Sequence, residues 1–224
     1  MWIDGLLCVG LGYALGNIQP AFAFARSRGY DARVDGSGNV GASNAFILAG
    51  KLALFVTALL DIGKAFLACR LCRLLFPELG VAEQLGGVAC ILGHMFPVLL
   101  RFRGGKGLAC LGGVALSWSW RIFLILLALA LAIALATRYV SFVAPIMSLL
   151  LPGLHYYWMR SLPALLVLLV PALPVIAKHL ENFRRILAGT EARTSFLWDR
   201  QGELRRLGRA EDGSPLAPED RSDT

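Results

Sequence analysis

Long apolar runs, separated by short polar breaks, leave this chain few folds to adopt. Seven such runs lie at about residues 3–25, 47–69, 81–100, 107–118, 122–136, 142–152 and 162–177. Most are long enough for a helix to cross much or all of the roughly 30 Å hydrocarbon core of a bilayer. Hydrophobic residues make up 57% of the chain and the mean hydropathy is +0.63, which is too apolar for a soluble domain of 224 residues. The sequence predicts an all-α, polytopic membrane protein with seven transmembrane helices.

The positive charges predict how these helices are oriented. With the N-terminus outside, seven crossings put loops 26–46, 101–106 and 137–141 and the C-terminal region on the cytoplasmic side. All 22 Lys and Arg residues then lie on or near that side except Lys64, Arg70, Arg73, Arg121 and Arg160. Cytoplasmic loops of membrane proteins carry this excess. We therefore expect an outside N-terminus, a cytoplasmic C-terminus and all the glycine-rich loops at one membrane face.

The charge and the cysteine content limit which partners, metals and cofactors the protein is expected to bind. The net charge is +7, but the basic residues are not interleaved with aromatic residues as on a nucleic-acid surface. Membrane lipids are the expected partners, and nucleic acid is not. A zinc site needs about four ligands, and the Cys69-x-x-Cys72 pair has neither a second pair nor a nearby histidine. We expect buried thiols, no metal and no cofactor. Residues 1–5 lack the basic region of a cleaved signal peptide.

The first polar break holds a concentration of residues suited to binding an anion. Within 35–44 lie Gly36, Ser37, Gly38, Asn39, Gly41, Ser43 and Asn44. Glycines permit positive φ angles and leave backbone N–H groups free to converge on one ligand. Ser and Asn side chains add short donors, so phosphate is the expected ligand. A flexible polar linker would show the same composition, and both interpretations stay open at this level.

Three further breaks offer complementary groups on the same face. The second contains Gly104, Gly105, Lys106 and Gly107, the third contains Arg138 and Ser141, and the last contains His179 and Asn182. A lysine among free amides suits phosphate. Simpler roles exist: Lys106 as an anchor at the membrane surface, His94 as a structural histidine, and His179 as part of a solvated helix face. The glycine-lysine stretch lacks the upstream glycine and following Ser/Thr of a P-loop.

Two other sequence features concern the packing of the helices and the division of the chain into domains. Asp61 and Lys64, three residues apart within an apolar run, face either a polar interior or each other as an ion pair that fixes helix packing. Residues 1–194 form the expected membrane-embedded domain. Residues 195–224, rich in charge and containing Pro215 and Pro218, are expected to be a disordered cytoplasmic tail.

Four stretches, in order along the chain, resemble the bacterial acyl-phosphate:glycerol-3-phosphate acyltransferases, the PlsY-type membrane enzymes. They are Asp31–Arg33 with Gly36–Asn44; Gly93–Pro97 with Phe102–Gly107; Thr137–Ser141; and Lys178–Arg185 with Gly189–Glu191. The similarity covers about residues 10–194. It implies a seven-helix protein of the bacterial inner membrane, with its active site facing the cytoplasm. Its substrates would be acyl phosphate and glycerol 3-phosphate, and its products lysophosphatidic acid and phosphate.

The resemblance also assigns roles to residues. The implied catalytic set is Lys106, Ser37, His179, Asn182 and Ser141. The implied substrate-binding set is Gly36, Gly38, Asn39, Gly41, Ser43, Asn44, His94, Gly104, Gly105, Gly107 and Arg138. Lys106 and backbone amides would offset charge on the leaving phosphate and on the carbonyl oxygen, and the acyl phosphate itself would take the hydroxyl proton.

One departure weakens the analogy. The family usually carries an arginine three positions after the residue equivalent to Asn44, and this chain has Ile47 there. The runner-up interpretation is therefore a diverged paralogue, which acts on another phosphorylated acceptor or binds lipid phosphate without catalysis. A small-solute transporter is the third and least favoured interpretation, because such proteins place their polar groups near the membrane midplane and here these groups gather at one face.

Overall fold

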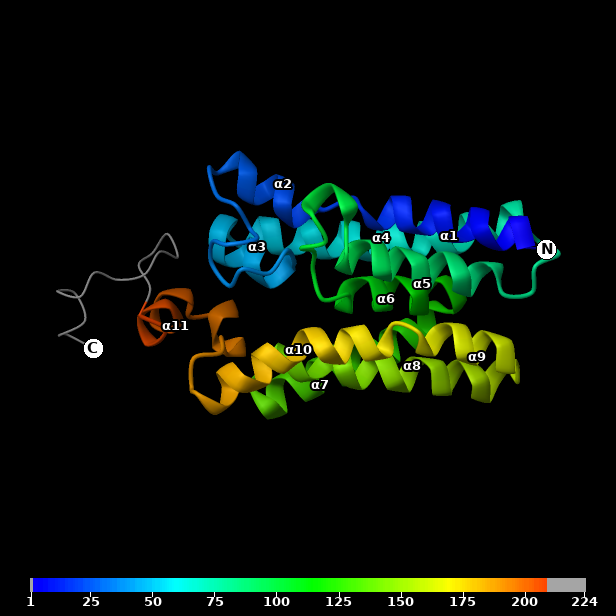
Figure 1. The fold of residues 1–224 in the computed structure, drawn as a ribbon. Helices are drawn as coiled ribbons and strands as arrows, with labels where there is room; N and C mark the ends of the chain where they lie inside the picture. The colour runs from blue at the N-terminus through cyan, green and yellow to red at the C-terminus, as the bar shows by residue number, and fades with distance from the viewer. Residues whose placement is uncertain (1, 209–224) are drawn as a thin grey trace.

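The computed structural model describes residues 2–208, and within them the protein is entirely helical (Figure 1). The helices are α1 (Trp2–Gly16), α2 (Pro20–Ser27), α3 (Ala42–Ala49), α4 (Lys51–Leu75), α5 (Ala82–Met95), α6 (Leu108–Trp118), α7 (Trp120–Thr137), α8 (Val143–Met159), α9 (Leu162–Leu169), α10 (Ala172–Leu187) and α11 (Arg200–Arg206). Three 3₁₀ turns, Val98–Leu100, Val140–Phe142 and Thr194–Leu197, complete the secondary structure. The predicted all-α class is confirmed.

Six helical stretches are long and apolar enough to cross a membrane. They are Trp2–Ser27, Lys51–Leu75, Ala82–Leu100, Trp120–Thr137, Val140–Met159 and Leu162–Leu187. The run expected to be the remaining crossing forms α6, an apolar helix of only 11 residues. At 1.5 Å per residue it is about 16 Å long, roughly half of the hydrocarbon thickness. The structure thus supports a multi-pass membrane protein with six candidate spans, and a seventh crossing through α6 stays a prediction.

Protein covers α6 along most of its length, which explains how so short a helix fits into the bundle. Most of its side chains are buried, and it packs closely on α4. At Gly113 an added Cβ would lie 2.2 Å from the carbonyl oxygen of Ile62, so only glycine lets the two backbones approach this closely. By contrast, α7 exposes almost all of its apolar side chains. In a membrane α7 would face lipid and α6 would face protein.

A buried charge cluster joins α1, α4 and α5. Lys64 Nζ lies 2.7 Å from Asp61 Oδ1, and both side chains are almost fully buried. The same ammonium donates to the carbonyl oxygen of Ile18 at 2.6 Å, just beyond the end of α1, and lies 3.0 Å from His94 Nδ1 of α5. Carbonyls left unpaired at a helix end need a donor, and Lys64 supplies it. The ion-pair interpretation of these charges is confirmed.

The expectations for the cysteines and for the tail have different outcomes. All five cysteines are buried free thiols, as predicted. The expected disorder from residue 195 is wrong for residues 195–208, which form the turn Thr194–Leu197 and helix α11. The Asp199 side chain caps α11 by accepting from the amide of Gly202 at 2.9 Å. Residues 209–224, the rest of the predicted tail, lie outside the described residues.

Candidate active site

Helices from distant parts of the chain meet at the end of the bundle opposite the N-terminus. Figure 1 shows α2, α3 and α11 gathered there, with the C-terminal end of α10 reaching towards them. The glycine-rich loop 35–41 leads directly into α3, and residues 188–199 connect α10 to α11. The polar breaks found in the sequence therefore converge at one end of the molecule.

Asn44, at the start of α3, holds the first glycine-rich loop in shape. Its side chain is completely buried; its Oδ1 accepts from the amide of Ser37 at 2.7 Å. Its Nδ2 donates to the carbonyl oxygens of Ala32 and Asp35, each at 3.1 Å. Gly36 has φ +63°, and a Cβ there would lie 2.1 Å from Asn44 Oδ1, so both residues are needed for this turn. The Asn44 side chain thus supports the loop by bonding to the backbone of the loop.

Arg33 and Asp31 brace the same loop from its other side. The Arg33 guanidinium donates from Nη2 to Asp31 Oδ2 at 2.6 Å and from Nε to Oδ1 at 2.9 Å. Hydrogen bonds from Arg33 hold the pKa of Asp31 well below its usual value, at about 2, so the pair stays ionised at neutral pH. The guanidinium also lies over the Phe22 ring, 5.3 Å from its centroid. Asp31 thus holds the Arg33 guanidinium against the loop and offsets its charge there.

Gly105 brings the second glycine-rich loop against the first. Its amide donates to the carbonyl oxygen of His94 at 3.1 Å. A Cβ at Gly105 would lie 2.1 Å from His94 Nε2 and 2.5 Å from the carbonyl oxygen of Val40, which belongs to the first loop. Only glycine fits between these groups. His94 is buried between Gly105 and Lys64, so it supports the loop, which is the structural role considered for it from the sequence.

Lys178 of α10 fixes the second loop in place. Its Nζ donates to the carbonyl oxygens of Met95 at 2.5 Å and of Gly104 and Gly105 at 3.2 Å. The ammonium also lies 4.8 Å from the centroid of the Phe96 ring. Sequence reasoning missed this residue because a lysine in a basic amphipathic helix looks like one more surface charge.

Lys106 enters a hydrogen-bonded network formed by α10 and the segments beside it. Its Nζ donates to Asn182 Oδ1. Asn182 Nδ2 donates to Ser141 Oγ at 3.1 Å and to Glu191 Oε1 at 2.5 Å, and Ser141 Oγ donates to the same carboxylate oxygen at 2.5 Å. Arg185 Nε pairs with Glu191 Oε2 at 2.9 Å. Three of the five residues in the implied catalytic set thus lie in one network.

Glu191 is the functional candidate that sequence reasoning did not select. Its carboxylate is buried, and its two oxygens accept from Ser141, Asn182 and Arg185. Fifty residues separate Glu191 from Ser141, so no local sequence pattern predicts this contact. The available signal was its place directly after the glycine and threonine that end a basic helix.

The surroundings of Lys106 favour an anionic ligand. Burial, followed by repulsion from Arg185, lowers the pKa of Lys106 to about 8, although Glu191 and Glu181 act in the opposite direction. The only partner shown for its ammonium among residues 2–208 is the neutral amide oxygen of Asn182. A partly desolvated cation without a direct carboxylate partner binds a phosphate oxygen strongly.

His179 lies one turn before Asn182 on the buried face of α10. Its Nδ1 is 2.7 Å from the carbonyl oxygen of Val175. A carbonyl can only accept, so Nδ1 carries the proton, and Nε2 of the neutral ring is an acceptor. Arg138, by contrast, is exposed and has φ +65°, and its carbonyl oxygen accepts from the amide of Thr194 at 2.9 Å. Its backbone contacts the segment after α10, and within residues 2–208 no hydrogen bond or ion pair of its guanidinium is shown.

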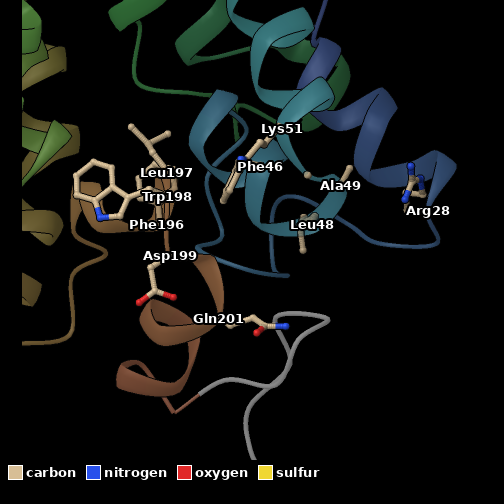
Figure 2. A pocket seen from close by; sticks show the side chains of 11 residues that line it. Arg28, Phe46, Leu48, Ala49, Lys51, Phe196, Leu197, Trp198, Asp199 and Gln201 are labelled. Carbon is tan, nitrogen blue, oxygen red and sulfur yellow. The ribbon is translucent and has the colours of Figure 1, made fainter.

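A cavity of about 550 Å³ lies near this region but is separate from the Lys106 network (Figure 2). Its walls come from the end of α2, from α3, from the start of α4 and from the segment before and within α11. The lining residues are Arg28, Phe46, Leu48, Ala49, Gly50, Lys51, Phe196, Leu197, Trp198, Asp199 and Gln201. This list contains none of the residues predicted for the site.

Comparison with known proteins gives one consistent result. A family model described as glycerol-3-phosphate acyltransferase matches residues 6–189. A glycerol-3-phosphate acyltransferase from Sinorhizobium fredii is 39% identical over 189 residues, which cover 84% of this chain and 91% of the relative. One from Symbiobacterium thermophilum is 40% identical over 183 residues, covering 82% and 91%.

A solved structure agrees. It is PlsY (YgiH), an integral membrane glycerol 3-phosphate acyltransferase, in its glycerol 3-phosphate form. This chain is similar to it with a TM-score of 0.78 and 32% identity, over 86% of this chain and 96% of that one. The lysophosphatidic acid form of PlsY matches with a TM-score of 0.74 and 31% identity.

Fold and site together define a multi-pass membrane protein with a cationic, glycine-lined site at one end of its helical bundle. The chain belongs to the glycerol-3-phosphate acyltransferase family and is an acyltransferase of phospholipid synthesis. The family resemblance in the four sequence stretches is confirmed.

Proposed function

We propose that this protein transfers a fatty acyl group from acyl phosphate to the 1-hydroxyl of sn-glycerol 3-phosphate, releasing lysophosphatidic acid and phosphate. The observation that carries the proposal is Lys106, a half-buried cation held by Asn182 in the second glycine-rich loop, whose Gly105 lies against the first. The solved relative in its glycerol 3-phosphate and lysophosphatidic acid forms supports the acceptor and the product. Acyl phosphate as donor rests on the sequence resemblance and on a site suited to a phosphate leaving group.

The reaction needs charge stabilisation more than it needs a protein base. The acceptor hydroxyl oxygen forms a bond to the acyl carbonyl carbon, and the bond from that carbon to the phosphate oxygen breaks. The hydroxyl proton passes to the departing phosphate. Lys106 offsets the charge growing on that phosphate and on the carbonyl oxygen, because the amides of Gly104 and Gly105 already donate to the carbonyl oxygens of Met95 and His94. In this scheme Asn182 holds the Lys106 ammonium in position.

We assign the acceptor phosphate to the first loop, at Ser37, Gly38 and Asn39, with the side chains of Ser37 and Asn39 as donors, because the amides of Ser37 and Gly38 already donate within the loop. This assignment is supported by the shape that Asn44 and Gly36 impose on the loop and by its contact with Gly105 through Val40. Ser141 and His179 complete the polar wall, with His179 Nε2 as an acceptor for the glycerol hydroxyl groups. The excess of Lys and Arg near this end supports a cytoplasmic active site, with the N-terminus outside.

Ile47 favours a second candidate, a diverged enzyme that prefers a different phosphorylated acceptor. Its side chain is 8% exposed and lies on α3, the helix whose first turn carries Asn44. Asp31 offsets the charge of Arg33, so that residue adds little net positive charge for a phosphate. Losing one charge-assisted bond to phosphate costs about 1.5–3 kcal/mol, which weakens acceptor binding and leaves the acyl-transfer groups in place.

The deciding experiment supplies purified protein with palmitoyl phosphate and glycerol 3-phosphate, and measures both phosphate and lysophosphatidic acid. Formation of the two products in equal amounts, abolished in Lys106→Ala, supports the proposal. Replacing palmitoyl phosphate by palmitoyl-CoA tests the donor, and a set of phosphorylated polyols tests the acceptor. A wild-type rate no greater than that of Lys106→Ala with every acceptor would contradict the catalytic role.

A further inference from the structure

The part of the chain beyond the family match is folded onto the site. The family model ends at residue 189, and the segment 193–206, here called the C-terminal clamp, follows it. At its centre lies the buried carboxylate of Glu203. Glu203 Oε1 accepts from the amide of Arg193 at 2.8 Å, and Oε2 accepts from Ser195 Oγ at 2.9 Å. Burial raises the pKa of Glu203, but its hydrogen bonds, led by those from Arg206, outweigh this effect and hold the pKa below its usual value.

Arg206 connects the clamp to the turn that carries Glu191. Its Nε donates to Glu203 Oε1 at 3.0 Å. Its two terminal nitrogens donate to the carbonyl oxygen of Gly189 at 2.6 Å and to that of Glu191 at 2.5 Å. A guanidinium can make these bonds at once because its donors lie in a fixed plane. Arg206 therefore holds the backbone at both sides of Thr190.

The other end of the clamp reaches α3. Phe196 is buried against Phe46, with ring centroids 5.2 Å apart. Figure 2 shows Phe46 on its helix next to the segment Phe196–Trp198. The amide of Thr194 donates to the carbonyl oxygen of Arg138, which leads into the turn that carries Ser141. The clamp thus contacts the turn that carries Glu191, the residue that leads into the turn of Ser141, and helix α3, which carries Asn44.

We propose that Arg206 and Phe196 are positioning residues of the acyltransferase, with Arg206 held in place by Glu203. Arg206 acts through Glu191, whose carboxylate holds Asn182, the residue that orients Lys106. Phe196 acts through α3, whose Asn44 shapes the loop at Ser37. This inference rests on the proposed function. It predicts different kinetic effects at the two ends of the clamp, because one end supports the reacting cation and the other supports the acceptor loop.

The test compares full-length variants with matched controls. Arg206→Ala is paired with Arg205→Ala, which removes the same charge from an exposed neighbour whose side chain has no hydrogen bond or ion pair shown within residues 2–208. Phe196→Ala is paired with Trp198→Ala, because Trp198 is 66% exposed. We expect Arg206→Ala to lower kcat about tenfold with little change in KM, since small displacements of a catalytic group are costly. Phe196→Ala is expected to raise the KM for glycerol 3-phosphate severalfold with a smaller effect on kcat.

A pH profile separates positioning from loss of folded protein. The charges that act on Lys106 are Arg185 and Glu181 of α10, together with Glu191. Lys178 and His179 of the same helix are the other titratable groups within electrostatic reach of it. Glu191 raises the pKa of Lys106, so its displacement in Arg206→Ala moves the alkaline limb of kcat/KM to lower pH. A smaller folded fraction leaves the limb where it is. Arg206→Lys, which keeps the charge with fewer donors, is expected to fall between wild type and Arg206→Ala.

If the wild-type protein is active, equal kcat values and equal alkaline limbs of the kcat/KM profile for Arg206→Ala and Arg205→Ala would overturn the role of the clamp. If wild-type protein transfers no acyl group, the proposed function fails instead. The clamp is then tested by hydrogen exchange at residues 189–191, which must be faster in Arg206→Ala than in Arg205→Ala. Equal exchange in the two variants would reject the clamp independently of activity.

Discussion

Replacing Lys106 by methionine tests the central assignment directly. Methionine keeps an unbranched apolar stem of similar length, and it removes the ammonium that donates to Asn182. Removing one preorganised donor to a developing negative charge costs about 2.7–4 kcal/mol, which corresponds to about a 10²–10³-fold loss in kcat. The upper part of this range applies here because the cation is half-buried and its direct partner is a neutral amide. We therefore expect kcat to fall by about 10³.

The assay measures lysophosphatidic acid formed from palmitoyl phosphate at saturating glycerol 3-phosphate. The matched control is Lys51→Met, which removes the same charge from an exposed lysine at the start of α4. This variant is expected to stay within about twofold of wild type, since exposed charges contribute little. A Lys106→Met enzyme that keeps more than a tenth of the wild-type kcat would refute the assignment of charge stabilisation to this residue.

The same geometry leads to four further predictions. The value of kcat/KM falls as pH rises through about 8, because burial and Arg185 lower the pKa of Lys106 to about 8 and the neutral amine cannot offset phosphate charge; a profile flat to pH 10 contradicts this. In Lys106→Arg any remaining activity loses that alkaline limb, because arginine stays protonated. Asn44→Ala removes three hydrogen bonds of a fully buried side chain, so the free energy of unfolding should fall by about 2–4 kcal/mol. This is measured by thermal unfolding of the purified protein, and an unchanged melting temperature would argue against Asn44 as the residue that holds the loop in shape. Ile47→Arg lowers the KM for glycerol 3-phosphate about tenfold or more if this is the native acceptor, and an unchanged KM in a folded variant favours a different acceptor.

Much of the site could be predicted from sequence because its groups sit in local patterns. Glycines beside Lys106, and His179 with Asn182 on one helical face, are visible without a structure, and resemblance to a known family put them in one site. The pair Asp61 and Lys64 could be predicted for the same reason, since helical spacing alone brings their side chains together.

Other parts depend on contacts between distant segments. Glu191 is one acid among many until Ser141, fifty residues earlier, is seen to donate to it. Lys178 looks like a surface charge until its carbonyl partners near Gly104 are known. The segment after residue 194 has the charge content of a disordered tail, but Glu203 and Arg206 pair with each other, and Arg206 also bonds to the turn at Gly189. Composition records how many charges a segment has and not which of them are paired.

The Lys64 cluster has a consequence for how the bundle is assembled in the membrane. Lys64 is neutralised by Asp61 on its own helix, but its other bonds are to the carbonyl oxygens of Gly16 and Ile18 at the end of α1 and to the ring of His94 on α5. If α1 or α5 slid by one turn, about 5.4 Å, the ammonium would lose these partners inside a low-dielectric medium. Misaligned insertion intermediates are thus penalised as soon as the three helices meet. The cluster fixes their depth relative to one another, and with it the height at which the loops of the active site emerge.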